Sequence, residues 1–509
     1  MTGSNRPTVL FLVHRIPYPP NRGDRIRSFH ILDFLARRAE VALAFLSEKL
    51  PSDEALQTLR ERCCWIGWAR WGRYSRWLRA AWSFARGKTA TEGLFASGRL
   101  RRQLREWLRQ HRPNAVMVFC SSMAQYLDLP GLENVRTVVD LVDVDSQKWF
   151  DYARLSRGWR RWAYEQEGHR LRQLERWIGQ RADAVLLTGP HEAALYRQIA
   201  PEANIQVVIN GVDTEYFRPD FSSPPVCEAQ EANRPSSSGM PEGLRAGISA
   251  PPVCEAPGPN RPLGRSIPEA QAAGRATPES HMPGGWDADV HSPRAADVHS
   301  PAGIPSEGQA RCVFVGALDY QANIDGVAWF CQEVWPLVRR RRPDGELVVV
   351  GSNPTGAVYR LAGQTPGFRL VGPVPDVRPY LAQAEVVVVP LRVARGIQNK
   401  VLEGMAMGKA VLATPQALEG LAVQPGVHAE SAAEPADWAE KLCRLWADPG
   451  RRAALGQAGR RFVETYHQWD QVLRPLAHIL GLPESEAVSQ ETDTFDHVFP
   501  LPAKKQVTF

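Results

Sequence analysis

Short apolar runs alternate with longer amphipathic stretches over the first 219 residues. Runs rich in β-branched and aromatic residues predict strands, and a period near 3.6 predicts helices. The predicted strands are Val9–Val13, Val41–Phe45, Ala115–Phe119, Thr137–Leu141, Ala184–Leu187 and Gln206–Ile209. Helical periodicity covers Ile26–Arg38, Leu100–Gln110 and Trp159–Gly179. This alternation favours a parallel sheet with crossover helices.

A second series of the same kind runs from 310 to 481. Its predicted strands are Cys312–Gly316, Glu346–Gly351, Phe368–Val371, Glu385–Leu391 and Ala410–Ala413. Its predicted helices are Asp325–Arg340, Pro375–Gln383, Asn399–Met407, Asp437–Trp446 and a last long one over Arg451–Ile479. At 509 residues the chain is long enough for two cores, so we expect two Rossmann-like α/β domains.

The stretch between the two series has almost no apolar periodicity. Residues 220–309 are dominated by Pro, Gly, Ser, Ala and Glu, and PPVCE at Pro224–Glu228 recurs at Pro251–Glu255. Two degenerate copies without an apolar face predict a disordered insertion that grew by duplication. The polar residues 482–509 predict a flexible tail. The expected domains are therefore 1–219 and 310–481.

Charge and cysteine content exclude several classes of protein. The net charge of +6 is small for this length, and no base-reading module is evident, so we expect no nucleic acid partner. The eight cysteines form no C-x-x-C pair, which argues against a zinc or thioredoxin site. The apolar run Val9–Val13 is too short for a signal peptide or membrane span. These features predict a cytoplasmic protein.

The segment from Pro390 to Thr414 carries the strongest chemical signal. An apolar strand ends at Leu391, a short loop contains Gly396, and a helix begins near Asn399. Such a junction in a parallel sheet presents free backbone N–H groups and the positive end of the helix dipole, which bind anions. Arg395 and Lys400 add positive charge suited to a diphosphate, and Glu403 is placed to accept from a ribose diol. The residues alone leave open a solvated ion pair between Lys400 and Glu403.

Motifs in a fixed order identify a resemblance to family-four glycosyltransferases of the GT-B type. The segment Asn399–Gly408 resembles their donor-binding helix. Ile209–Asp213 followed by Phe217–Pro219 resembles the interdomain signature, and Phe314–Gly316 resembles the opening of the second domain. Glu346–Gly351 and Val371–Asp376 resemble the next two strand ends. The resemblance covers both domains and skips the insertion.

This resemblance implies two domains facing across a cleft, with a nucleoside diphosphate sugar as donor and no bound metal or cofactor. It implies donor-binding roles for Gly396, Asn399, Lys400 and Glu403. Most members of the family carry two glutamates across this loop and helix. Glu403 matches the second glutamate, but Arg395 occupies the position of the first. Arg395 is therefore a candidate diphosphate ligand in place of a sugar-binding glutamate.

Two further segments narrow the resemblance. Pro17–Arg27 contains Gly23 between the first strand and first helix, where such enzymes bring the backbone close to the donor phosphate, and Asp24 is a candidate helix cap. Asp140–Trp149 ends a strand with three carboxylates, of which Asp143 is the candidate catalytic residue. The same carboxylates also resemble a divalent-metal cluster or a helix cap. Both segments resemble sugar transferases of bacterial exopolysaccharide and exosortase systems.

Tryptophan and arginine alternate over residues 68–86. Trp68, Trp71, Trp77 and Trp82 are interleaved with arginines. Such a stretch fits the surface of an anionic membrane, and it also fits a helical face packed on the sheet through its aromatic rings.

We therefore expect a retaining transferase that moves a sugar from a nucleoside diphosphate donor to a saccharide or lipid-linked acceptor, in exopolysaccharide biosynthesis. Two alternatives stay open. One is a sugar-nucleotide epimerase of the same architecture, and the other is a non-catalytic scaffold related to glycosyltransferases, which the replacement of the first glutamate favours. A nicotinamide-dependent oxidoreductase fits poorly, because the first strand is not followed by G-x-G-x-x-G.

Overall fold

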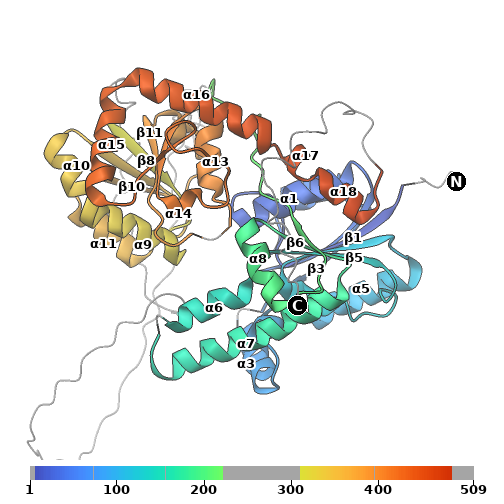
Figure 1. Cartoon of the computed structure of the whole chain (residues 1–509). Helices are drawn as coiled ribbons and strands as arrows, with labels where there is room; N and C mark the ends of the chain where they lie inside the picture. The colour runs from blue at the N-terminus through green and yellow to red at the C-terminus, as the bar shows by residue number, and fades with distance from the viewer. Residues whose placement is uncertain (1–5, 73, 155, 222–309, 395, 484–509) are drawn as a thin grey trace, which may run out of the picture. The chain divides into compact units, whose positions relative to one another are not determined.

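Two parallel β-sheets flanked by helices make up the described part of the chain (Figure 1). The computed structural model describes residues 6–72, 74–154, 156–221, 310–394 and 396–483. The predicted insertion and the predicted tail, apart from two residues at the start of each, lie outside the described residues, and so does Arg395. The predicted α/β class with two Rossmann-like sheets is confirmed.

The first sheet has seven strands in the order β3-β2-β1-β4-β5-β6-β7, and all neighbours are parallel. The strands are β1 (Thr8–Val13), β2 (Glu40–Ser47), β3 (Trp65–Arg70), β4 (Ala115–Phe119), β5 (Arg136–Val142), β6 (Ala184–Leu187) and β7 (Ile205–Val207). Strands β1, β2 and β4 are continuous apolar runs because helices bury both faces of the sheet.

Its helices are α1 (Gly23–Ala36), α2 (Asp53–Arg60), α3 (Ser75–Ala85), α4 (Ala90–Phe95), α5 (Gly98–Gln110), α6 (Asp145–Arg154), α7 (Gly158–Arg181) and α8 (Pro190–Ile199), with a 3-10 helix at η1 (Ser121–Tyr126). Several begin at polar residues that satisfy the free backbone N–H groups. Ser52 and Ser97 accept from the backbones of α2 and α5, and Thr89 forms a capping box with Glu92.

The second sheet has six strands in the order β10-β9-β8-β11-β12-β13, again all parallel. Its strands are β8 (Arg311–Val315), β9 (Glu346–Val350), β10 (Phe368–Gly372), β11 (Val386–Val389), β12 (Ala410–Ala413) and β13 (Glu430–Ser431). Its helices are α9 (Gln321–Trp329), the π-helix η2 (Phe330–Val334), α10 (Trp335–Arg341), α11 (Gly356–Gln364), α12 (Arg378–Ala382), α13 (Asn399–Ala406), α14 (Pro415–Leu418), α15 (Pro435–Ala447) and α16 (Pro449–Tyr466).

The prediction of one helix over Arg451–Ile479 is wrong. The chain leaves α16 at His467 and continues as α17 (Trp469–Val472) and α18 (Arg474–Leu480). The break is fixed by the connection after β7, since Val212 N donates to His467 O at 2.7 Å. Helix α16 packs on α13, whereas α18 packs on β5 of the first sheet.

Other predicted bounds change for local reasons. The helix predicted over Asp325–Arg340 is interrupted by the π-helix η2 just before Pro336, which lacks a backbone N–H. The helix predicted over Pro375–Gln383 begins only at Arg378, next to Pro379. The strand predicted over Gln206–Ile209 is found at Ile205–Val207.

The tryptophan and arginine stretch is not one continuous element. Trp65–Arg70 forms the edge strand β3, which the sequence reasoning missed, and Trp68 lies half-buried on it. Trp71 is buried and so is not free to meet a membrane. Only the part of the stretch on α3 presents an exposed tryptophan, Trp82.

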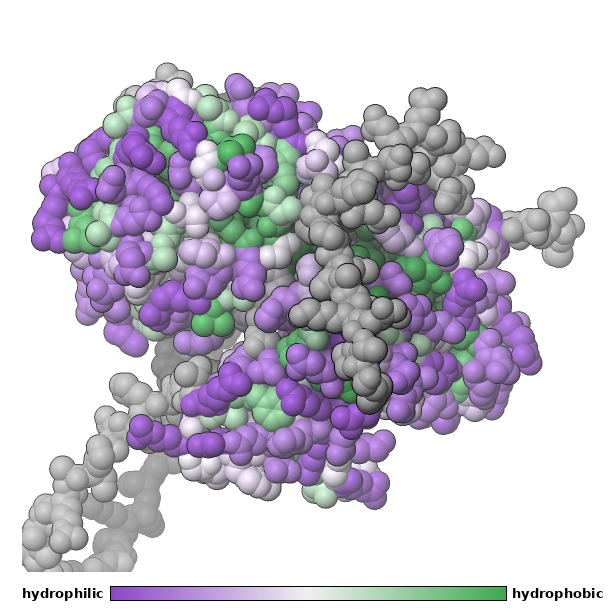
Figure 2. Space-filling model, viewed as in Figure 1, coloured by the Kyte–Doolittle hydropathy of each residue, from purple (hydrophilic) through white to green (hydrophobic). Residues whose placement is uncertain are grey.

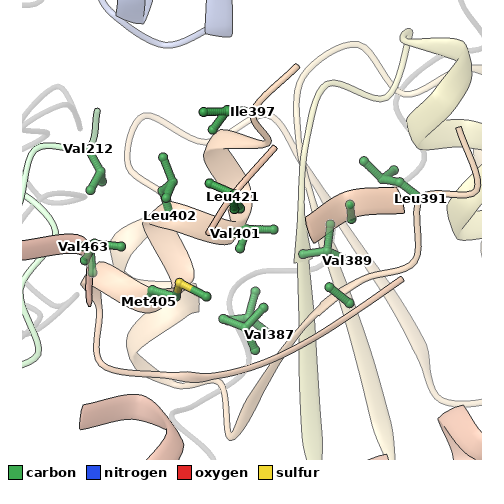
Figure 3. Packing of buried hydrophobic residues seen from close by; sticks show 14 of the residues in the cluster. Val212, Val387, Val389, Leu391, Ile397, Val401, Leu402, Met405, Leu421 and Val463 are labelled. Carbon is green, nitrogen blue, oxygen red and sulfur yellow. The ribbon is translucent and has the colours of Figure 1, made fainter. Parts of the chain in front are cut away.

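Helix α13 is held against the second sheet by its apolar side. Val401, Leu402 and Met405 are buried. In Figure 3 Met405 points toward Val387 of β11 and lies next to Val463 of α16. A side chain at Gly404 would meet Val387 and Val411 at 3.1 Å, so the helix lies close to the strands. This packing fixes the position of the first turn of α13.

Candidate functional site

In each sheet, strands are added first toward one edge and then toward the other, so each sheet has a topological switch point. In the first sheet this switch lies between β1 and β4, and in the second between β8 and β11. Ligands of open α/β sheets bind beyond the carboxyl ends of the strands at such a switch. The loop with Gly23 follows β1, and the loop with Gly396 follows β11. Both predicted loops therefore stand where the topology places a site.

At the switch point of the second sheet, strands β8 and β11 are paired over only part of their length. Strands β8 and β11 pair only through Val386 with Cys312 and Val387 with Val313. Beyond these pairs the strands diverge toward their carboxyl ends. Helix α13 starts beside this opening, and its N-cap residue Gln398 makes no side-chain capping bond. Val401 N donates to Gln398 O at 3.0 Å, which leaves the backbone N–H groups of Asn399 and Lys400 for an anion.

Lys400 is held in the first turn of α13 by a residue from the other side of the opening. Its Nζ donates to Asn323 Oδ1 at 3.0 Å, and Asn323 Nδ2 donates to Ala317 O at 2.8 Å. The ammonium also lies 5.6 Å from the ring centre of Phe314. Burial lowers the pKa of Lys400 to about 8, against the opposing effect of Glu403. The arrangement holds a cation in a partly desolvated position, where its field on a phosphate is strong.

Glu403 lies one turn further along α13. Burial raises the pKa of its carboxyl to about 7, and the charge of Lys400 opposes that shift. Within the described residues Glu403 and Lys400 form no ion pair closer than 4 Å, because the ammonium is bonded to Asn323. The solvated ion pair left open by the sequence is therefore not what the structure shows.

Asp143 stands at the end of β5 on an unusual backbone. Val142 has a φ of 68°, a conformation that β-branched residues rarely adopt. The register between β5 and β6 shifts at this point. Asp143 N donates to Leu141 O at 2.8 Å, and Thr188 Oγ1 donates to Asp143 Oδ1 at 3.2 Å. Backbone strain of this kind gathers at functional sites.

Asp143 contacts the loop before α13. A Cβ added to Gly396 would lie 2.6 Å from Asp143 Oδ1 and 2.9 Å from Thr188 Oγ1. Burial raises the pKa of Asp143 to about 7, and the charges of Glu192 and Asp145 act in the same direction. The candidate catalytic carboxyl and the candidate donor loop are therefore brought together, with the carboxyl near its titration point at neutral pH.

The other two carboxylates of the Asp140–Trp149 segment have separate partners. Asp140 is fully buried and accepts from Arg27 Nε at 2.7 Å. Asp145 accepts from Ser121 Oγ at 2.6 Å. The three do not converge, and no group of metal-binding side chains is present in the described part of the chain. Helix α6 begins at Asp145, so Asp145 and Ser146 are its first two residues and do not precede it, and Ser146 Oγ donates to Glu175 at 2.6 Å.

Gly23 lies where the sequence placed it, at the first residue of α1. A Cβ there would lie 3.9 Å from Asn399 Nδ2, so its backbone faces the start of α13. Asp24 does not cap α1, contrary to expectation. It pairs instead with Arg15 at 2.9 Å and His14 at 3.3 Å. Burial opposes the shift, but the hydrogen bond from His14 and the charge of Arg15 hold the pKa of Asp24 far below its usual range.

Sequence reasoning missed several residues that support these groups. Asn210 Nδ2 donates to Asn399 Oδ1 at 3.1 Å, and Asn210 Oδ1 accepts from Arg27 at 3.0 Å. Asn323, which accepts from Lys400, was not among the predicted donor-binding residues. His191 is exposed at the start of α8, 3.9 Å from Glu419.

A pocket of about 260 Å³ lies beside Gly396. Its lining combines residues of the α8 start with residues of the loops after β11 and β12, namely Gly189, His191, Glu192, Arg392, Val393, Ala394, Gly396, Ile397, Gln416, Glu419 and Gly420. The walls carry both carboxylates and a guanidinium, which suits a polar ligand.

Gly396→Ala tests whether the close approach to Asp143 matters. The new methyl group would press on the carboxylate and strain a φ of 59°, so we expect roughly a tenfold loss of affinity for the donor beyond any loss of stability. Gly426→Ala is the matched control, since its φ is 81° but its Cβ would meet nothing within 4 Å. Equal affinities in the two variants would show that the approach has no role in binding.

Domain models of known families match both halves of the chain. A model described as "Glycosyl transferase 4-like domain" matches residues 30–211, and one described as "Glycosyl transferases group 1" matches residues 309–448. A curated relative from Corynebacterium glutamicum, a GDP-mannose-dependent monoacylated alpha-(1-6)-phosphatidylinositol monomannoside mannosyltransferase, is 31% identical over 156 residues. That match covers 28% of this chain and 41% of the relative, so the chain spans less than half of the relative's length.

Solved structures with the same two-sheet arrangement cover nearly the whole chain. Sucrose-phosphate synthase from Thermosynechococcus elongatus matches 93% of this chain and 98% of its own, with a TM-score of 0.57 and 14% identity. WaaG, a glycosyltransferase involved in lipopolysaccharide biosynthesis, matches 93% and 100%, with a TM-score of 0.55 and 14% identity. HepE from Anabaena, in complex with UDP and glucose, matches 94% and 100%, with a TM-score of 0.53 and 11% identity. At these identities the likeness establishes the GT-B fold.

Proposed function

We propose that this chain, a member of the GT-B glycosyltransferases, moves a sugar from a nucleoside diphosphate donor to a saccharide or lipid-linked acceptor. The observation that carries the proposal is the first turn of α13, where Lys400 is fixed by Asn323 and Gly396 lies against Asp143. A cation, the first N–H groups of a helix and a half-buried carboxyl meet there, at the switch point of the second sheet.

In this proposal the donor diphosphate lies at the start of α13. Its oxygens accept from the backbone N–H groups and from Lys400, and Arg395 supplies a further positive charge from the preceding loop. Glu403 accepts from the ribose hydroxyls, and the backbones of Gly23 and Gly396 admit the phosphate and sugar. These groups neutralise the leaving diphosphate, so the proposed reaction has no resident metal or cofactor.

The transfer breaks the bond between the anomeric carbon and the diphosphate oxygen and forms one to an acceptor oxygen. The acceptor hydroxyl proton passes to the departing diphosphate. Asp143 is proposed to contact the reacting sugar, where its negative charge stabilises positive charge that develops at the anomeric carbon. Retention of configuration is proposed from the sequence resemblance.

A lipid-linked acceptor is supported by the Corynebacterium relative, which is named as a transferase acting on a phosphatidylinositol monomannoside. With such an acceptor the protein would act in the cytoplasm at the inner face of the membrane. No helix of the described residues has both the length and the apolar character to cross a bilayer. Exopolysaccharide biosynthesis is the proposed setting, on the resemblance of the Pro17–Arg27 and Asp140–Trp149 segments.

A non-catalytic scaffold is the second candidate, because Arg395 stands where the family carries a glutamate. A panel of nucleoside diphosphate sugars, scored by thermal shift, separates the two. The correct donor at about 100 times its Kd should stabilise the protein by about 2.7 kcal/mol. Incubation with an acceptor should then release the nucleoside diphosphate, and NMR of the product reports the anomeric configuration.

Stabilisation without any transfer would support the scaffold. Conversion of the donor alone into an epimer would instead indicate an epimerase. If no sugar nucleotide stabilises the protein, the proposed donor site is wrong.

A further inference from the structure

Five large apolar side chains stand exposed on two neighbouring helices of the first half. Their exposed fractions lie between 56% and 74%, and they are Tyr74, Leu78, Trp82, Trp159 and Trp162. The first three follow at intervals of four residues, which places them along one side of α3. The last two lie in the first turn of α7. We call these five residues the α3–α7 face.

Contacts between α3 and α7 hold the face together. The rings of Phe84 and Trp162 meet edge to face at 6.1 Å. Arg170 of α7 donates to Phe84 O at 2.6 Å and to Lys88 O at 3.0 Å. The buried Glu167 accepts from Ala90 N at 2.7 Å and so fixes the start of α4 beside α7. In Figure 2 the surface over α3 and α7, at the lower edge of the view, carries white and pale green residues next to purple ones.

The charge around this face is mainly positive, although Arg76 pairs with Glu48 at 3.2 Å and Arg161 pairs with Glu165 at 2.8 Å. Residues 71–91 contain five Arg and Lys and no Asp or Glu, and residues 155–164 contain three Arg and no acidic residue. Arg86 lies 3.5 Å from the ring centre of Trp82, and Arg160 lies 5.7 Å from that of Trp159. A guanidinium therefore lies near each of these two exposed indole rings.

We propose that the α3–α7 face binds the surface of an anionic lipid bilayer. Indole rings favour the headgroup level, and arginines beside them meet the lipid phosphates. Trp and Arg are also common at the centres of protein interfaces. The lack of acidic residues over both segments favours an anionic surface as the occupant. This inference deepens the proposed function and rests on it, because membrane binding would hold the protein next to a lipid-linked acceptor.

Vesicle co-sedimentation of the full chain tests the proposal. The protein should bind vesicles of phosphatidylcholine mixed with phosphatidylglycerol, bind phosphatidylcholine alone far less, and lose affinity as salt is added. The variant Trp82→Ser/Trp159→Ser/Trp162→Ser should bind roughly tenfold more weakly or worse. Tyr359→Ser on α11 is the matched control, because Tyr359 is 59% exposed, as is Trp82. It should bind as the parent does.

Equal binding by the triple variant and the parent, at unchanged melting temperature, would overturn the proposal. So would the absence of binding to anionic vesicles. A dimer of the parent in sedimentation velocity that the triple variant abolishes would assign the face to self-association instead. Donor-induced stabilisation without vesicles should be the same in the parent and the triple variant. If no donor stabilises either the parent or the triple variant, the proposed function is refuted and the lipid result still stands.

Discussion

Asp143→Asn is expected to lower kcat/KM for sugar transfer by on the order of 10²-fold or more. The carboxyl is fixed by Thr188 and lies against Gly396, where the transferred sugar is proposed to sit. The amide keeps the shape and the bond from Thr188 but removes the negative charge. Asp128→Asn, at an exposed carboxylate of the same half, is the control and should leave the rate unchanged.

Asp143→Asn is expected to lower activity but to raise stability at high pH. That combination distinguishes a catalytic group from a structural one. Because the folded-state pKa of Asp143 is raised to about 7, the carboxyl favours folding below about pH 4 and loses this contribution as the pH rises through 7. At pH 8 the buried charge is a cost that the amide removes. The variant should therefore melt at a higher temperature than the parent at pH 8. Unchanged activity, or a lower melting temperature there, would contradict the assignment.

Arg27→Met should be the most destabilising of these substitutions, by about 3–5 kcal/mol in the free energy of unfolding. Arg27 and Asp140 are both buried, and the guanidinium also donates to Val208 O at 2.9 Å and to Ile209 O at 3.1 Å. Methionine fills similar space but leaves the Asp140 carboxylate buried without its partner. Urea unfolding measures the loss.

Two further variants make that result specific. Arg25→Met changes a less deeply buried arginine of the same helix and should cost far less. Arg27→Met/Asp140→Leu removes both charges and should recover part of the loss, because no uncompensated charge remains. The loss of unfolding free energy in the double variant is compared with the summed losses of Arg27→Met and Asp140→Leu. If the two are equal, the loss comes from the backbone contacts of Arg27 and the ion pair contributes little.

Apolar pattern predicted the sheets well, because burial on both faces of a parallel strand leaves a continuous signal. Strands β4, β6 and β12 were predicted with the residues at which they occur. Strand β3 was missed because its tryptophans and arginines resemble an amphipathic surface segment. The last helix was predicted without its break, since the bond between Val212 and His467 joins residues far apart in sequence.

The candidate site was predicted in its residues but not in its contacts. Asn399 and Lys400 stand on the first turn of α13 and Glu403 stands on the next, yet the bond of Lys400 to Asn323 could not be read from the sequence. The positive φ of Val142 was equally hidden, because valine gives no sign of it. The convergence of Gly396 with Asp143 depends on elements from both sheets.

Calorimetric titration with a nucleoside diphosphate tests the central claim most directly. The nucleoside diphosphate used is the one whose nucleobase gives the largest thermal shift. Its affinity for the parent is compared with its affinity for Glu403→Ala. Loss of charge-assisted bonds to the ribose should weaken binding by roughly 10-fold or more. Glu440→Ala, at an exposed glutamate of α15 outside the pocket, should bind as the parent does. Equal affinity of the parent and Glu403→Ala would show that Glu403 of α13 does not hold the nucleotide.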